Sequence, residues 1–439
     1  MGCSNSIDAR QTTHRSRLEE TDVFLPDQDK LTFRGDDTDR NKDPILKGIK
    51  PGTPLYKQLT TLISNEKVFF DTDFPPQVSS ITTDEQHPNY NYYKPAVWKR
   101  PPEIFDCSYE EIKLFDTIDI KDATKGMLND GYFISSLSAI AEDPAILRQM
   151  FLNHYANKHA LYGLKFYLQG LPTVVFVDDF FPCFDYNQKE PIFTKPKGKE
   201  LWAMIAEKAW AKIYKSYLAT EIGTQEEALE NLTGAPSFGF FTKEQTEDET
   251  WQILNRANSK GYIMGATSDV APAESEITGL VIDQCYTIIS VHDVEGHRLL
   301  KMRNPWGTFE WKGAYCDGSP LWTASMKKAV DYLTAKDGVF FITLSDFRRH
   351  FNRYAVNSYY ENWQYTHTQI ESSSNHAEYF KFSIEEPCEV YFRIHQTDKR
   401  TLPKEEQRGF KYSPGNFMVV QILKDGSLKP IGKDIHFSS

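Results

Sequence analysis

The chain has 439 residues, of which 40% are hydrophobic and 14% aromatic, and its formal net charge at pH 7 is −11. Its length is enough for about three domains, and its apolar content excludes a wholly disordered protein. The acidic balance argues against non-specific nucleic-acid binding, which needs a basic surface to displace counterions, so we expect no nucleic-acid partner.

Two further absences narrow the class of protein. No run of about 18 apolar residues is present, so the sequence predicts no membrane-spanning helix. The six cysteines show no CxxC spacing, which excludes a zinc ribbon and favours a reducing compartment. They stand at positions 3, 107, 183, 285, 316 and 388.

The first six residues carry an acylation signal. Gly2 with Ser6 matches the pattern for N-myristoylation, and Cys3 is a candidate palmitoylation site beside it. Two acyl chains bind a membrane stably where one binds only marginally. A weak basic bias over residues 7–18 would favour an anionic leaflet. We therefore expect a cytoplasmic protein anchored to the inner membrane leaflet.

The N-terminal quarter divides into two segments. Residues 1–45 are polar and without periodicity, which predicts a disordered, acylated leader. Residues 46–105 mix short apolar pieces with Pro-rich stretches and are predicted to form an extended arm packed on the body of the protein.

The next part of the chain has the patterns of helices and strands. Apolar residues at helical spacing predict a buried helix over residues 131–155 and an amphipathic helix over residues 198–217. Two β-rich runs, at residues 164–168 and 173–179, are bounded by Gly and Pro and are predicted strands.

The C-terminal half is richer in strands. Residues 250–350 alternate predicted strands with Gly-rich turns. Residues 357–439 hold short alternating runs at 379–384, 389–394 and 416–422, which favour a β-sandwich.

Several segments, in the right order, resemble the core of the calpain family of cysteine proteases. The segments are 67–75, 98–104, LNDGYFISSLSAIAEDP (128–144), VDDFFP (177–182), 200–217, RNPWGTFEWKGAYCDGSPLW (303–322) and 337–351. The resemblance implies an α+β fold, a two-lobed papain-like cysteine protease core followed by an antiparallel β-sandwich. The lobes would be residues 106–218 and 219–355, and residues 356–439 would be a shortened sandwich.

The residues at the family's catalytic positions cannot perform its chemistry. A papain-like protease needs a Cys at a helix N-terminus, a His as its base and an Asn to orient that His. The resemblance puts Gly131 at the nucleophile position, Gln284 at the base position and Lys125 at the oxyanion-hole position. Asn304 is retained, in a run that continues to Trp306.

A displaced nucleophile is a weak alternative. Cys285 follows the lost base position, but it would lie on a strand without a helix dipole to lower its pKa. We interpret it as a small buried residue. The sequence therefore predicts a calpain-like pseudoprotease acting as a scaffold or regulator, with protein partners that include cytoskeletal or axonemal (ciliary) ones. The alternative is an active calcium-dependent cysteine endopeptidase.

The resemblance also implies a calcium site in each lobe, because Ca²⁺ binds six to eight oxygens from acidic loops. In the first lobe, Asp122 and Glu200 match the family's carboxylates. In the second lobe, Glu310, Asp317 and Asp337 match, but an apolar residue replaces one acid, so weaker binding is expected there.

Overall fold

The computed structural model describes residues 44–46, 49–116, 118, 123–361, 364–367, 382–384, 388–402, 404–412, 415–423 and 427–437. Residues 1–43 of the predicted leader, with Gly2 and Cys3, lie outside these residues, and so does Asp122. Among the described residues, no helix combines the length and the apolar character that a membrane span requires.

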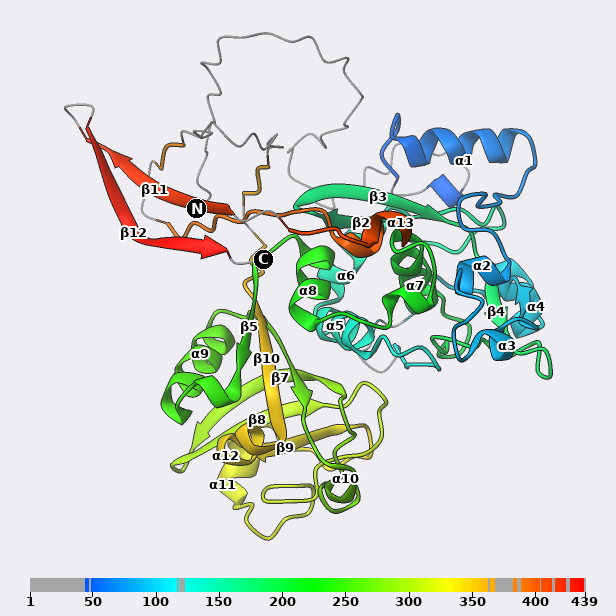
Figure 1. Ribbon diagram of the computed structural model, residues 1–439. Coiled ribbons are helices and arrows are strands. Elements are labelled where there is room, and N and C mark those ends of the chain that lie inside the picture. Colours follow the sequence, from blue (N-terminus) through cyan, green and yellow to red (C-terminus); the bar gives the residue numbers. More distant parts are fainter. Residues whose placement is uncertain are drawn as a thin grey trace.

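The first part of the chain forms a mainly helical region (Figure 1), which we call the helical region. Its helices are α1 (Pro54–Ser64), α2 (Val78–Ile81), α3 (Tyr90–Tyr93), α4 (Pro101–Phe105), α5 (Gly131–Ala141), α6 (Pro144–Met150), α7 (Trp202–Ile213) and α8 (Gln225–Thr233). Its strands form two antiparallel pairs, β1 (Val97–Lys99) with β4 (Phe181–Cys183) and β2 (Tyr162–Leu168) with β3 (Leu171–Val177).

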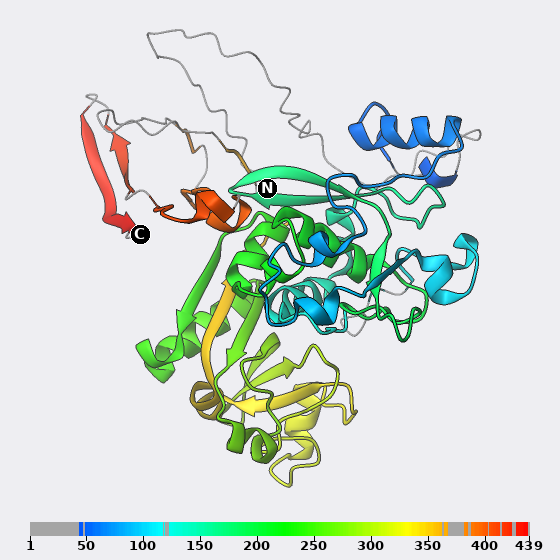
Figure 2. The same cartoon turned by 45° about the vertical axis from the view of Figure 1, so that its right-hand side comes forward.

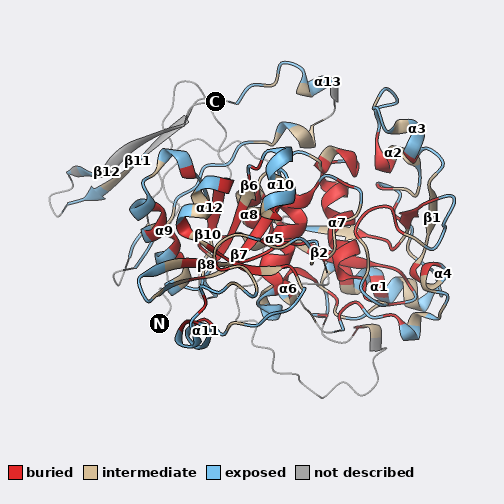
Figure 3. Ribbon diagram, turned by 90° about the horizontal axis from the view of Figure 1, so that it is seen from below, coloured by how far each residue is buried: buried red, intermediate tan, exposed pale blue. Residues whose placement is uncertain are grey.

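Helices α5 and α7 form the centre of the helical region, and both are almost entirely buried (Figure 3). Phe133 of α5 stacks on Trp210 of α7 with ring centroids 4.8 Å apart. Helix α8 packs into the same apolar cluster through Leu229 and Leu232. The predicted lobe boundary at residue 218 puts α8 with the second lobe; α8 contacts α5 and β2 of the helical region and also strands of the second part of the chain.

The second part is built on a six-stranded antiparallel sheet, which we call the sheet region. The strand order is β5 (Ser237–Phe241), β10 (Phe351–Asn357), β6 (Ile263–Ser268), β7 (Cys285–Val294), β8 (His297–Arg303) and β9 (Val339–Thr343). The helices here are α9 (Glu247–Ser259), α10 (Pro272–Thr278), α11 (Ala324–Ala329) and α12 (Leu344–His350). Helix α5 contacts β6 and β7, and Gly131 at the start of α5 lies next to Gln284, the residue before β7.

Among the described residues, the C-terminal part contains a 3-10 helix (Lys399–Thr401), the short α-helix α13 (Lys404–Gln407) and a hairpin of β11 (Gly415–Ile422) and β12 (Leu428–Phe437). Figures 1 and 2 both show this hairpin away from the helical and sheet regions. The predicted strand at 416–422 is confirmed as β11. The predicted strand at 389–394 is wrong, because that segment is irregular.

That irregular segment contacts both regions. Glu389 forms an ion pair with Lys260, which directly follows α9, at 2.6 Å, and Arg393 forms one with Glu230 of α8, also at 2.6 Å. Arg400 pairs with Glu227 of α8 and lies over the ring of Tyr214. The C-terminal segment therefore crosses from the sheet region to the helical region along the surface.

Two predicted elements differ in the structure. The helix predicted over 131–155 is two helices, because Pro144 cannot continue α5 and instead starts α6, capped by the Asp143 carboxylate. The arm at 46–105 is not simply extended: Thr53 caps α1 at the Tyr56 N–H, and Pro54 occupies the first helical position. The predicted helix at 198–217 and the two predicted strands are confirmed as α7, β2 and β3.

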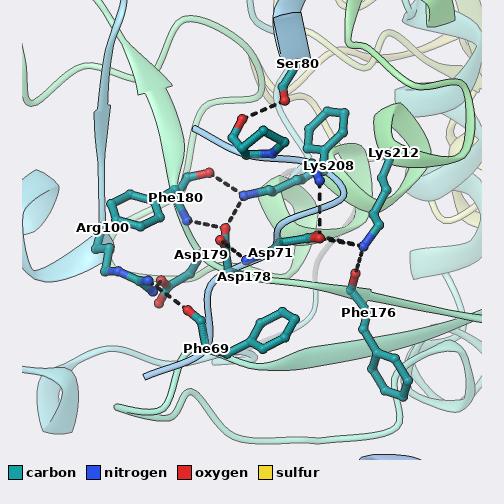
Figure 4. A network of polar contacts seen from close by, with 12 residues as sticks. Phe69, Asp71, Ser80, Arg100, Phe176, Asp178, Asp179, Phe180, Lys208 and Lys212 are labelled. Carbon is teal, nitrogen blue, oxygen red and sulfur yellow. Dashed lines mark hydrogen bonds and ion pairs between the residues drawn. The ribbon is translucent and has the colours of Figure 1, made fainter. Parts of the chain in front are cut away.

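A buried network of ion pairs ties that arm to the helical region (Figure 4), and we call it the buried ion network. It pairs three acids with three cations. The pairs are Lys208 with Asp178, Lys212 with Asp71, and Arg100 with Asp179. Asp178 also accepts the Asp71 N–H at 2.9 Å. Because every charge is paired, the network can fix the chain near Asp71 against α7 without leaving an isolated buried charge.

Candidate functional site

A cavity of about 300 Å³ lies where the two regions meet. The helical region contributes Gly131 at the start of α5 and the loop before α8, and the sheet region contributes residues before and on β7 and on β10. Its described lining is Lys125, Asn129, Gly131, Tyr132, Glu221, Gly223, Thr224, Gln225, Glu226, Phe241, Thr267, Asp283, Gln284, Cys285, Asn352, Arg353, Tyr354 and Ala355.

The structure brings Gly131 and Gln284 face to face in this cavity. A Cβ placed on Gly131 would lie 3.0 Å from Gln284 Nε2 and 3.5 Å from Gln284 Oε1. Gly131 is the first residue of α5, so a side chain there would sit at the positive end of the helix dipole. A nucleophile and a base need this adjacency, but a glycine has no side chain and an amide does not accept a proton at neutral pH.

Lys125 lies at the rim of the same cavity. Its ammonium is 3.4 Å from Asn129 Oδ1 and 5.7 Å from the centroid of the Trp306 ring. Trp306 belongs to the sheet region and is 36% exposed, so Lys125 reaches from one region towards the other. In the described part of the chain, Lys125 has no carboxylate partner.

Asn304 does not line the cavity. It is buried, and its Nδ2 donates to the carbonyls of Thr308 (2.7 Å) and Phe309 (3.1 Å). Its Oδ1 accepts the Trp306 N–H at 3.0 Å. Asn304 therefore organises the turn that presents Trp306, and its contact with the rest of the site runs through Trp306 and Lys125.

Cys285 is buried in the cavity wall, as the sequence predicted. Its thiol lies 3.4 Å from Thr267 Oγ1, and burial raises the pKa of the thiol to about 11. None of the described lining residues is a histidine. At neutral pH this thiol is protonated and has no base beside it, so it is a poor nucleophile.

Behind Gly131 lies a pair of buried carboxyl groups that the sequence reasoning missed. Asp130 is fully buried, and both its carboxyl oxygens lack a hydrogen-bond donor. Burial and the neighbouring Glu207 raise the pKa of Asp130, and burial raises the pKa of Glu207 to about 7. Glu207 also accepts the Thr194 N–H and hydroxyl. One shared proton would satisfy both groups, since two adjacent carboxylates repel each other.

Sequence spacing could not reveal this pair. Asp130 and Glu207 are 77 positions apart, and Glu207 lies inside an amphipathic helix where an exposed acid is the ordinary expectation. One feature of the sequence does indicate that Glu207 is buried. It lies on the apolar stripe of α7, three residues after Met204 and three before Trp210.

The predicted calcium ligands are only partly brought together. Glu200 is buried, and its Oε1 accepts the Asp116 N–H at 2.6 Å. Its predicted companion Asp122 lies outside the described residues. In the sheet region, burial, with the charges of Glu310 and Asp337, raises the pKa of Asp317.

The geometry of those three acids does not form a closed metal site. Glu310 Oε1 accepts the N–H groups of Asp337 (3.0 Å) and Gly338 (2.9 Å), so this oxygen is already engaged. No group of three or more acidic, His or Cys side chains in the described residues is arranged to hold a metal ion. Carboxylates on loops are nonetheless the donor type that Ca²⁺ prefers.

Comparison with known proteins places the chain in a family. Residues 69–358 match the calpain family of cysteine proteases. The chain is 32% identical over 302 residues to the calpain-type cysteine protease DEK1 of Zea mays, 29% over 319 residues to calpain-9 of Rattus norvegicus and 28% over 307 residues to the calpain-2 catalytic subunit of Gallus gallus.

The matches cover 66%, 69% and 66% of this chain. They cover 14% of the length of the maize protein, 44% of the rat protein and 42% of the chicken protein, so the chain matches less than half of each relative. The matched range contains Gly131, Gln284 and Asn304, together with the cavity and its lining. The chain belongs to the calpain family of cysteine proteases.

Proposed function

We propose that this chain is a calpain-family pseudoprotease, which binds peptide segments in its cleft and does not cleave them. The observation that supports this most directly is the pair at the cavity. A Cβ built on Gly131 would lie 3.0 Å from Gln284 Nε2, so the two positions are adjacent, and neither residue can take part in acyl transfer.

We also propose a papain-like architecture for this chain. The helical and sheet regions would be the two lobes of a papain-like core, with the cleft between them, and residues after 356 a shortened β-sandwich. Their separate apolar clusters and the cavity lined from both sides support the two-lobed layout. The hairpin of β11 and β12 and its exposed apolar side chains, among them Met418 and Ile431, support an incomplete sandwich.

The test is hydrolysis of a casein-type substrate by the purified chain, with and without Ca²⁺. No hydrolysis is expected. Hydrolysis that a thiol-directed inhibitor abolishes, with one cysteine of the chain labelled stoichiometrically in the cleft, would establish the alternative, an active cysteine endopeptidase. A Cys285→Ser variant is the matched control, because it removes the nearest thiol without changing the cavity volume greatly.

A restoration experiment distinguishes lost chemistry from lost structure. The double variant Gly131→Cys with Gln284→His supplies a thiol at the start of α5 and an imidazole beside it. Adding Lys125→Gln supplies a neutral amide donor for the oxyanion. Measurable hydrolysis in the triple variant, and none with Gly131→Cys alone, would show that the cleft retains the productive arrangement.

Calcium binding is a separate part of the proposal. The three acids Glu310, Asp317 and Asp337 would contribute carboxylate oxygens, and Ca²⁺ would offset their mutual repulsion. Titration calorimetry with CaCl₂ alone should show binding, and Asp317→Asn should weaken it. Equal heats for the variant and the parent chain would remove this site from the proposal.

The proposed setting is the inner face of a membrane, where acylated Gly2 and Cys3 would anchor a scaffold or regulator with cytoskeletal or axonemal partners. Gly2→Ala should move the protein into the soluble fraction of a cell lysate. Retention in the pellet after detergent extraction would instead favour a cytoskeletal attachment that does not depend on acyl chains.

A further inference from the structure

Within the described residues, polar groups lining the cavity beside Gly131 use only part of their hydrogen-bonding capacity. Gln284 is 3% exposed, and its Nε2 donates only to the carbonyl of Cys285, at 3.0 Å. An amide nitrogen has two hydrogens, so one N–H of this buried side chain remains free beside the cavity. A buried donor without an acceptor is costly, which makes its presence at a cavity wall informative.

A cation lies in the same wall. Within the described residues, the Lys125 ammonium contacts only a side-chain oxygen of Asn129, at 3.4 Å, and the face of the Trp306 ring. The first two N–H groups of α5, those of Gly131 and Tyr132, have no intrahelical acceptor, and no side chain caps them. Helix dipole, ammonium and free amide N–H therefore all favour an anion at one place.

Two unpaired acids in the lining favour positive charge. Glu221 and Asp283 line the cavity and form no ion pair with any described residue. Glu226, by contrast, is paired with Arg353. A ligand complementary to the whole cavity is therefore negative near Gly131 and positive elsewhere.

We infer that the cleft recognises the C-terminal carboxylate of a peptide that carries Lys or Arg among its last residues. A peptide chain supplies both charges, and its terminal carboxylate can accept from Lys125, Gln284 and the first N–H groups of α5 together. Because Gly131 has no side chain, a carboxylate can approach these N–H groups where a larger residue would stand. This inference rests on the proposed function, since it names what the non-cleaving cleft holds.

The test compares two fluorescently labelled random heptapeptide mixtures with Arg as the penultimate residue. One ends in a free carboxylate and the other in a carboxamide. Fluorescence anisotropy with the full chain should show the acid form binding roughly tenfold tighter or more, as expected for a charge-assisted contact. Equal binding of the two forms, or no binding of either, would overturn the inference.

Variants assign the effect to the named residues. Lys125→Gln should reduce the preference for the acid form to about twofold or less and leave binding of the carboxamide unchanged. Lys57→Gln, at an exposed lysine on α1, is the matched control and should change neither. A Lys125→Gln variant that melts like the parent chain but keeps the full acid preference would place the carboxylate elsewhere.

Two further measurements are needed. The first distinguishes recognition of a peptide from binding of any small anion, and the second distinguishes failure of the proposed function from failure of the carboxylate inference. Acetate and inorganic phosphate at millimolar concentration should displace the acid peptide only weakly, and displacement as effective as that by unlabelled peptide would show a simple anion site instead. Mass spectrometry of the incubated peptides reports cleavage. Cleaved peptides would refute the proposed function, whereas intact peptides with no acid preference would refute only the carboxylate inference.

Discussion

The buried ion network and the cleft are both polar clusters, but their charges are satisfied to different degrees. In the buried ion network, the side chains of Lys208 and Asp178 are fully buried and bonded to each other. In the cleft, Lys125 and Glu221 form no ion pair with a described residue. The missing ion pairs are therefore a local property of the cleft, because the same fold pairs the charged side chains of the buried ion network.

The largest expected effect comes from breaking the buried ion network. Asp178→Asn keeps the shape of the side chain but leaves the Lys208 ammonium buried without its counter-ion. Removing one partner of a buried pair costs about 3–5 kcal/mol of unfolding free energy. Urea denaturation measures this.

The matched control is Asp106→Asn, which breaks the solvent-exposed pair with Lys189. It should leave the unfolding midpoint unchanged, because exposed pairs contribute little. Equal losses for the two variants would mean that the buried pair has no special role.

The second effect concerns pH and the carboxyl pair behind the cleft. The raised pKa values of Asp130 and Glu207 mean that the folded chain holds a proton that the unfolded chain releases at lower pH. Their stabilising contribution is therefore complete below about pH 4, where both groups are also protonated when unfolded, and is lost as the pH rises through about 7.

Glu207→Gln imitates the protonated acid at every pH. It should flatten the decline in stability between pH 5 and 8 and raise the unfolding free energy at pH 8, by on the order of 1–2 kcal/mol. Thermal melts across this pH range measure the slope. A variant with the same slope as the parent chain would show that the pair shares no proton.

A smaller effect is expected at Gly131. In Gly131→Ala the new methyl group would meet the flexible amide of Gln284 at 3.0 Å, which can move, so we expect a change within about 1 kcal/mol. Gly126→Ala is the contrasting control, since its Cβ would lie 1.8 Å from the backbone oxygen of Phe193. If Gly131→Ala proved as harmful as Gly126→Ala, the cavity at Gly131 would be closed to ligands.

The smallest effect is expected at Lys125. Because its ammonium forms no ion pair with a described residue, Lys125→Gln should change the unfolding free energy by no more than about 0.5 kcal/mol. Calorimetric melting of the two proteins checks this. A loss as large as that of Asp178→Asn would show that Lys125 supports the fold and is not available to a ligand.

Local patterns predicted much of the fold because their signals are short-range. Apolar residues at spacing four predicted α7, and Gly and Pro boundaries predicted β2 and β3. The prediction failed where a local feature was ambiguous. Pro144 divided the helix predicted over 131–155, and residues 389–394 form no strand but carry ion pairs to Lys260 and Glu230.

The sequence by itself determined the family resemblance and the residues at its catalytic positions, because those are properties of order and identity along the chain. Only the tertiary structure decided that Gly131 lies against Gln284, that Asn304 stands back from the cavity, and that Asp130 meets Glu207. The reason is physical: these contacts join positions 77 to 153 residues apart, and packing of α5 against α7 and β7 sets their distances. The incompletely bonded donors of the cleft, Lys125 and Gln284, likewise could be identified only from the positions of all their neighbours in the structure.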